Sequence, residues 1–175
     1  ILNAVGQPLR RKEDIRLLTG KGRFSDDFKL EGQVYAAMVR SPFPHARIVA
    51  VNKAAALAMP GVLAVLTGAD VAADKLEPIP HDPMPKTKFD MKLTAPDGNP
   101  APFIGPHALL PADKARHAGE AVAMVVAETL AQALDAAEAV EIDWEELPWV
   151  SKTLKALEPG APPVWDEIPG NCFIE

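Results

Sequence analysis

Residues 40–68 constrain the fold more than any other stretch, because they encode a complete strand–helix–strand unit. The apolar run 46–51 has the length of a buried strand. An alanine-rich helix is predicted over residues 53–59, and Asn52 is a favourable N-cap for it. A second buried strand is predicted over residues 62–67. One domain with strands and short helices follows from this unit.

A second unit of the same kind follows later in the chain. Residues 121–127 form a continuous apolar run of strand length, and Thr129 can cap the helix that comes next. Residues 141–147 alternate, with Ile142 and Trp144 on one face. The other face carries Glu141, Asp143 and Glu145. Because like charges are costly to bury, we interpret this face as solvated and not as an acid–base site.

Proline separates the two units. Half of the chain's 18 prolines lie between Pro78 and Pro111. Proline lacks a backbone donor, so residues 71–113 are predicted to form neither a long helix nor a central strand. We interpret the segment as a long extended loop that docks on a surface, which can belong to another domain. The apolar side chains that favour docking are Phe89, Met91, Leu93, Phe103 and Ile104.

The flanks are less regular. A short helix is predicted over residues 9–19, ended by Gly20-Lys21-Gly22, and a strand over residues 33–40. We therefore divide the chain into a lead-in (1–19), one α+β domain (20–150) and a tail containing proline and glycine (151–175).

Composition excludes several classes of protein. A net charge of −6, without a block of basic residues, predicts no nucleic-acid partner. No apolar run reaches the roughly 18 residues of a membrane span, and no signal peptide is visible. Cys172 is the one cysteine, which predicts no internal disulfide and fits a reducing cytoplasm.

The sequence contains no recognisable catalytic constellation. The four histidines include no pair spaced to bind one metal from a helix, and a metal site at His81-Asp82 is disfavoured. No nucleophile-elbow pattern is present. We therefore assign no catalytic, cofactor-binding or metal-binding residue to this chain.

One loop remains a candidate site. Arg40, His45 and Arg47 lie within eight residues, braced by Pro42 and Pro44. Such a loop can bind carbonyl groups of a neighbouring domain, hold a carboxylate or phosphate through its guanidinium groups, or be a plain surface turn. We predict an interdomain contact through Arg40, His45 and Arg47. A small-anion binding module built on the same residues is the alternative.

Five stretches, in order, resemble the large subunits of the molybdenum hydroxylases, the xanthine dehydrogenase and aldehyde oxidase family. The similarity is greatest to the aerobic carbon monoxide dehydrogenase type. Two departures from that family's pattern stand out: Phe43-Pro44 replaces small residues, and Trp144 replaces tyrosine. The stretches are GKGRFSDDF (20–28), RSPFPHARI (40–48), PGVLAVLTGAD (60–70), RHAGEAVAMVVAE (116–128) and residues 135–148.

The resemblance implies an α/β hammerhead domain, with a mixed sheet, short helices and a long proline-rich loop. It implies a parent enzyme that oxidises a small substrate at molybdenum with oxygen from water. It also implies a downstream molybdopterin-binding domain, beyond residue 175, and FAD and [2Fe-2S] centres on partner chains or domains. The segment itself is then a structural and interface domain, inactive when isolated.

Overall fold

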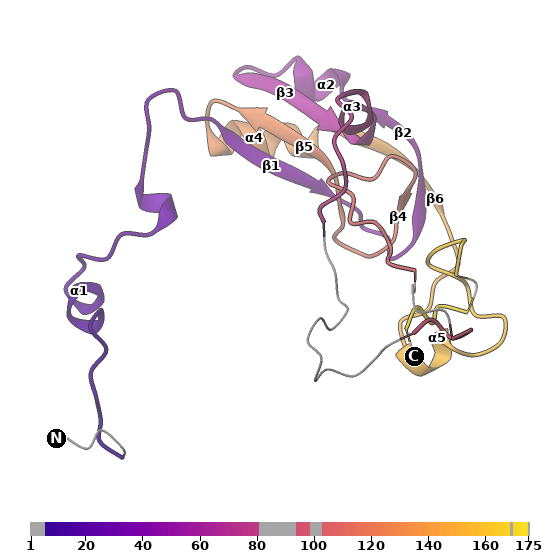
Figure 1. The fold of residues 1–175 in the computed structure, drawn as a ribbon. Helices are drawn as coiled ribbons and strands as arrows, with labels where there is room; N and C mark the ends of the chain where they lie inside the picture. Colours follow the sequence, from indigo (N-terminus) through magenta and orange to yellow (C-terminus); the bar gives the residue numbers. More distant parts are fainter. Residues whose placement is uncertain (1–5, 81–93, 99–102, 169, 175) are drawn as a thin grey trace. The chain divides into compact units, whose positions relative to one another are not determined.

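The computed structural model describes residues 6–80, 94–98, 103–168 and 170–174 (Figure 1). The chain divides into two compact units, residues 1–33 and residues 34–175. The first contains α1 (Asp14–Leu18) and the 3-10 helix η1 (Ser25–Asp27). The second contains β1 (Tyr35–Arg40), β2 (Ala46–Asn52), α2 (Ala54–Leu57), β3 (Val62–Thr67), α3 (Gly68–Ala73), β4 (Lys114–Ala115), β5 (Ala121–Ala127), α4 (Leu130–Glu138), β6 (Glu141–Glu146) and α5 (Thr153–Ala156).

The first unit has no buried residue among its described positions 6–33. Helix α1 is shorter than the predicted 9–19, because no packed core extends it beyond five residues. Its end is as predicted: Gly20 has a φ of 69°, and the Lys21 N–H donates to the Arg16 carbonyl at 2.9 Å.

The six strands in the described part of the chain form two three-stranded sheets. One sheet has the order β1-β5-β3 and the other the order β4-β2-β6, and every pair of these strands is antiparallel. The predicted α+β class with short helices is confirmed, but the expected mixed sheet is two antiparallel ones. The reason lies in the connections. Helix α2 leads from β2, in the sheet β4-β2-β6, to β3, in the sheet β1-β5-β3. Helix α4 leads back, from β5 in the second of these sheets to β6 in the first. The two strands of each strand–helix–strand unit therefore lie in different sheets.

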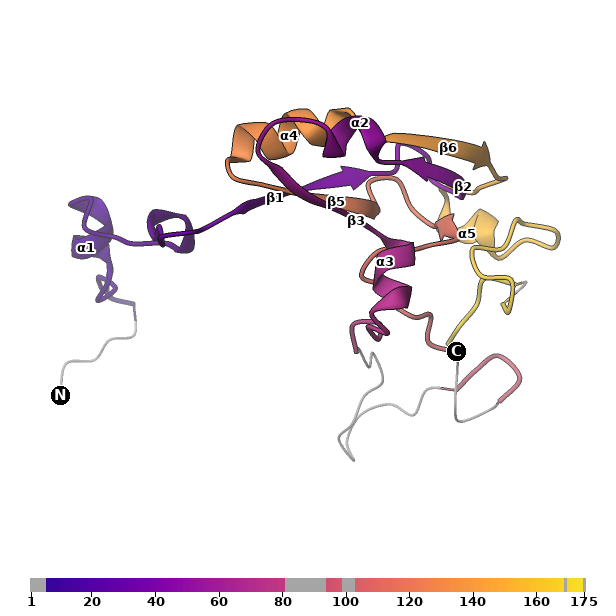
Figure 2. The ribbon, with the colours of Figure 1, turned by 90° about the horizontal axis from the view of Figure 1, so that it is seen from above.

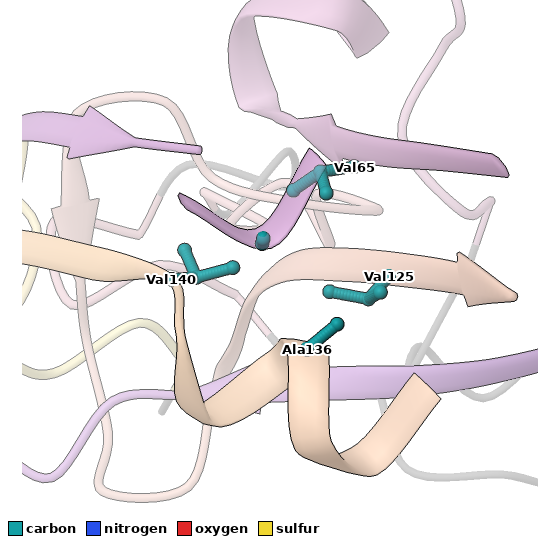
Figure 3. Packing of buried hydrophobic residues seen from close by; sticks show 5 residues of the cluster. Val65, Val125, Ala136 and Val140 are labelled. Atoms are coloured by element: carbon teal, nitrogen blue, oxygen red, sulfur yellow. The ribbon is translucent and has the colours of Figure 1, made fainter. Parts of the chain in front are cut away.

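The core lies between α4 and one face of the sheet β1-β5-β3 (Figure 2). Figure 3 shows Val65, Val125, Ala136 and Val140 meeting there. Alanines on the inner faces of α2 and α4, including Ala56, are fully buried. Small side chains let the helices approach the sheet closely, and this sets the thickness of the layer.

Helix capping is partly as predicted. Thr129 caps α4, with its Oγ1 accepting from the Gln132 N–H at 3.3 Å. Asn52 does not occupy the N-cap of α2, because it is the last residue of β2 and Lys53 takes that position. The Asn52 side chain still accepts from the Ala54 N–H at 3.1 Å, so it supports the first turn from one residue farther back.

The described parts of the proline-rich segment agree with the prediction. After α3 ends at Ala73, residues 74–80, 94–98 and 103–113 contain no helix, and their strand pairing is one isolated bridge between Ile79 and His107. The Phe103 ring docks within the same unit, 5.6 Å from the Trp165 ring and 6.1 Å from the Phe173 ring. Phe89, Met91, Leu93 and the His81-Asp82 pair lie outside the described residues.

Candidate interface site

The loop over residues 41–45 carries the chain from one sheet to the other, since β1 and β2 belong to different sheets. At one end, the Ser41 N–H donates to the Glu120 carbonyl at 2.9 Å, and the Gly119 N–H donates to the Ser41 carbonyl at 2.8 Å. At the other end, the Leu147 N–H donates to the His45 carbonyl at 2.9 Å. The loop therefore ties the start of β5 to the end of β6.

His45 is a buried part of this brace, with 7% of its surface exposed. Its Nδ1 lies 2.9 Å from the Pro148 carbonyl. Because a carbonyl can only accept, Nδ1 carries the proton in this hydrogen bond, and in the neutral imidazole Nε2 has the lone pair. Nε2 is buried and has no partner among the described residues. It is therefore an acceptor that a donor from elsewhere could satisfy.

The two arginines point to other partners. Arg40 donates through Nη1 to the Gly119 carbonyl at 2.8 Å. Arg47 forms a salt bridge with Glu145, its neighbour across the sheet, at 3.0 Å between Nε and Oε2. Both side chains of that pair are more than half exposed, so the pair contributes little stability. Arg40, His45 and Arg47 thus each engage a different partner, which leaves no preassembled anion cradle.

The two departures from the family pattern meet in this loop. The Phe43 ring lies edge-on to the Trp144 ring, at 5.8 Å between centroids and 62° between planes. Such a pair is worth roughly 0.5–1.5 kcal/mol beyond the buried area. Through this ring contact the loop packs on β6.

A second cluster joins the tail to the domain, and the sequence did not predict it. Lys114, whose side chain is 8% exposed, donates to both carboxylate oxygens of Asp166 at 2.8 and 2.9 Å. This hydrogen bond, together with the lysine's charge, lowers the pKa of Asp166. The Arg116 guanidinium stacks on the Trp165 ring at 4.0 Å. The sequence feature that could have indicated this contact is a tryptophan next to an aspartate, Trp165-Asp166, within a tail that contains proline.

A hollow of about 630 Å³ lies beside this cluster, and Arg116, His117, Glu120 and Trp165 are among its lining residues. Its charged groups engage one another. Arg116 pairs with Asp113 at 3.0 Å, and the backbone N–H of Arg116 donates to Glu120. Burial raises the pKa of Asp113, but hydrogen bonds from Arg116 and the Lys114 N–H outweigh it and lower that pKa overall. These contacts bind the charged side chains of the hollow to one another, although the buried Nε of Arg116 has no partner among the described residues.

The outward carboxylates of β6 are solvated, as predicted. Glu141, Asp143 and Glu145 are exposed, and on the adjacent β2 Asn52 donates to Glu141 and Arg47 to Glu145. Among the described residues, no three histidine, cysteine or carboxylate side chains come close enough to hold a metal ion. No described helix is long and apolar enough to cross a membrane.

Residues 19–148 match the family model of the aldehyde oxidase and xanthine dehydrogenase a/b hammerhead domain. The chain therefore belongs to this hammerhead family. Among curated relatives, it is 37% identical to the carbon monoxide dehydrogenase large chain of Hydrogenophaga pseudoflava, over 91% of this chain and 17% of the relative. It is 36% identical to the nicotine 6-hydroxylase large subunit of Paenarthrobacter nicotinovorans, over 98% of this chain and 19% of that subunit.

The likeness extends to solved structures of the hammerhead family. The crystal structure of the carbon monoxide-reduced Cu,Mo-CO dehydrogenase superposes with a TM-score of 0.70 at 37% identity, over 90% of this chain and 17% of that one. The chain thus spans less than a fifth of the length of these relatives. The hammerhead fold expected from the five sequence stretches is confirmed.

Proposed function

We propose that this chain is a non-catalytic structural and interface domain of a molybdenum hydroxylase large subunit of the carbon monoxide dehydrogenase type. The parent enzyme oxidises a small substrate with oxygen taken from water. One observation carries the proposal: the chain is equally similar to relatives named for carbon monoxide and for nicotine, at 37% and 36% identity. A segment that chose between these substrates would resemble one of these relatives more than the other.

The geometry of the loop supports a bracing role. Its hydrogen bonds connect the two sheets, and its arginines and histidine are engaged with separate partners. We propose that Arg40, His45 and Arg47 also face the molybdopterin-binding domain of the same subunit. The unpaired Nε2 of His45 is the most specific contact point, because a buried acceptor without a partner costs roughly 1–3 kcal/mol.

The cofactors of the parent enzyme are part of the same proposal. They are molybdenum held by molybdopterin in the large subunit, with FAD and [2Fe-2S] centres on partner chains or domains. Because molybdopterin itself supplies ligands to the molybdenum, we propose no residue of this chain as a ligand of the metal. No step of the reaction is therefore assigned to this chain. We place the parent enzyme in the cytoplasm, in keeping with the one unpaired cysteine, Cys172.

Metal analysis tests the proposal. The full large subunit, purified with its partners, is expected to contain about one molybdenum per subunit, while the purified 175-residue chain is expected to contain none and to show no oxidase activity. Stoichiometric molybdenum in the 175-residue chain would overturn the assignment. The anion-binding alternative is not favoured by any contact in the loop.

A further inference from the structure

The sheet β1-β5-β3 has a second face, opposite α4, that is apolar where solvent would favour polar residues. Strand register places Met38, Met124 and Leu66 in one row across the three strands. The next row holds Ala36, Val126 and Ala64. An antiparallel sheet with one solvated face normally shows polar side chains there. Two successive rows without a polar residue therefore indicate a face that is covered in the complete protein.

This face is hollowed as well as apolar. A hollow of about 230 Å³ lies over the methionine row, framed by α3, by residues that follow it and by Leu109 and Leu110. Met38 is 43% exposed, Leu76 52% and Leu109 41%. Methionine is unbranched and adapts its shape to a partner, so the floor of the hollow suits an inserted side chain.

Two acidic residues lie on the rim of the hollow. Asp70 and Asp74 line the hollow, and its described lining includes no basic residue. The Asp70 carboxylate is already paired with the Lys53 ammonium group at 3.0 Å, so Asp74 is the carboxylate that remains to meet a basic side chain of an occupant. The occupant that fits is an aliphatic or methionine side chain with a lysine or arginine beside it. An anionic membrane surface does not fit an acidic rim.

We infer that this hollow is the docking site for a segment of the same large-subunit polypeptide outside these 175 residues. The inference rests on the proposed function, because it assumes a longer parent chain. More than four fifths of the relatives' length lies outside the region that this chain matches. A segment of the same polypeptide is present at an effective concentration of the order of millimolar, whereas a second copy must be recruited from solution.

Cysteine labelling in the full-length subunit tests the inference. Met38→Cys places a thiol in the hollow, and Leu57→Cys is the matched control, since Leu57 on α2 is 44% exposed and lies outside the hollow. Alkylation of each introduced thiol is measured by peptide mass spectrometry in the native enzyme and after unfolding in urea. For each variant, the alkylation rate in urea is divided by the rate in the native enzyme. We expect this ratio to be at least tenfold greater for the Met38→Cys variant than for the Leu57→Cys variant. A smaller difference overturns the inference.

Photo-crosslinking identifies the occupant. Photo-methionine in place of Met38 is expected to crosslink to a peptide of the same polypeptide outside these 175 residues. A crosslink to another subunit, to a second copy or within the 175 residues overturns the choice of occupant. Molybdenum is measured on the same preparations. A Met38→Cys enzyme with full molybdenum but a freely labelled introduced thiol refutes the docking site alone, whereas a full-length subunit without molybdenum refutes the proposed function.

Discussion

Val125→Ala provides a quantitative test of the core. Val125 is fully buried in the central strand β5, facing Ala136 of α4. The change removes two methyl groups, which cost about 1.6 kcal/mol in transfer free energy at roughly 0.8 kcal/mol each. The strand is paired on both sides, to Ala37 of β1 and Val65 of β3, so it cannot move to close the space. The remaining cavity raises the expected loss to about 2–3 kcal/mol.

Urea unfolding followed by tryptophan fluorescence measures this loss. With a slope near 2 kcal/mol per molar urea, the midpoint is expected to fall by about 1–1.5 M without a change in slope. The control is Val49→Ala on β2, where the side chain is 61% exposed and the expected change is within about 0.5 kcal/mol. If the two variants unfold at the same midpoint, the assigned core between α4 and the sheet is wrong.

Two further changes test the surroundings of α3. The pKa of Asp70 is lowered by the Thr67 hydroxyl and then by Lys53, so its contribution to stability is complete above the ordinary value of 3.8 and is lost as the pH falls through the lower folded value. Asp70→Asn should therefore lower the urea midpoint by more at pH 6 than at pH 2, and an equal loss at both would contradict this. Gly68→Ala should destabilise the domain by about 1–3 kcal/mol, because the added Cβ would lie 2.6 Å from the backbone of Ala112. Wild-type thermal stability in that variant would show that the contact is loose.

The local pattern predicted most of the strands and one cap well. Continuous apolar runs over residues 62–67 and 121–127 were sufficient to locate β3 and β5, although β3 is an edge strand with Leu63 54% exposed and not the buried strand expected. Thr129 was identifiable because capping depends on the next three residues alone. The five ordered stretches identified the hammerhead family before the fold was known.

Contacts between distant residues were not predictable from the pattern. A strand–helix–strand unit does not show which sheet each strand joins, so the exchange of strands between two sheets was missed. The ion pair between Lys114 and Asp166 spans 52 residues and depends on the tail folding back. His45 was a candidate on chemical grounds, but its bond to Pro148, 103 residues away, is visible only in the fold.

A domain exchange tests the central claim, that this segment supports the enzyme without choosing its substrate. Residues 34–148 of the full parent subunit are replaced by the matching residues of the nicotine 6-hydroxylase large subunit. The two sequences are 36% identical over 98% of this chain. The quantity measured is the ratio of kcat/KM for the parent's own substrate to that for nicotine, which does not depend on how much of the hybrid is folded. The account predicts a ratio within about threefold of the parent's. A hybrid that prefers nicotine would contradict it.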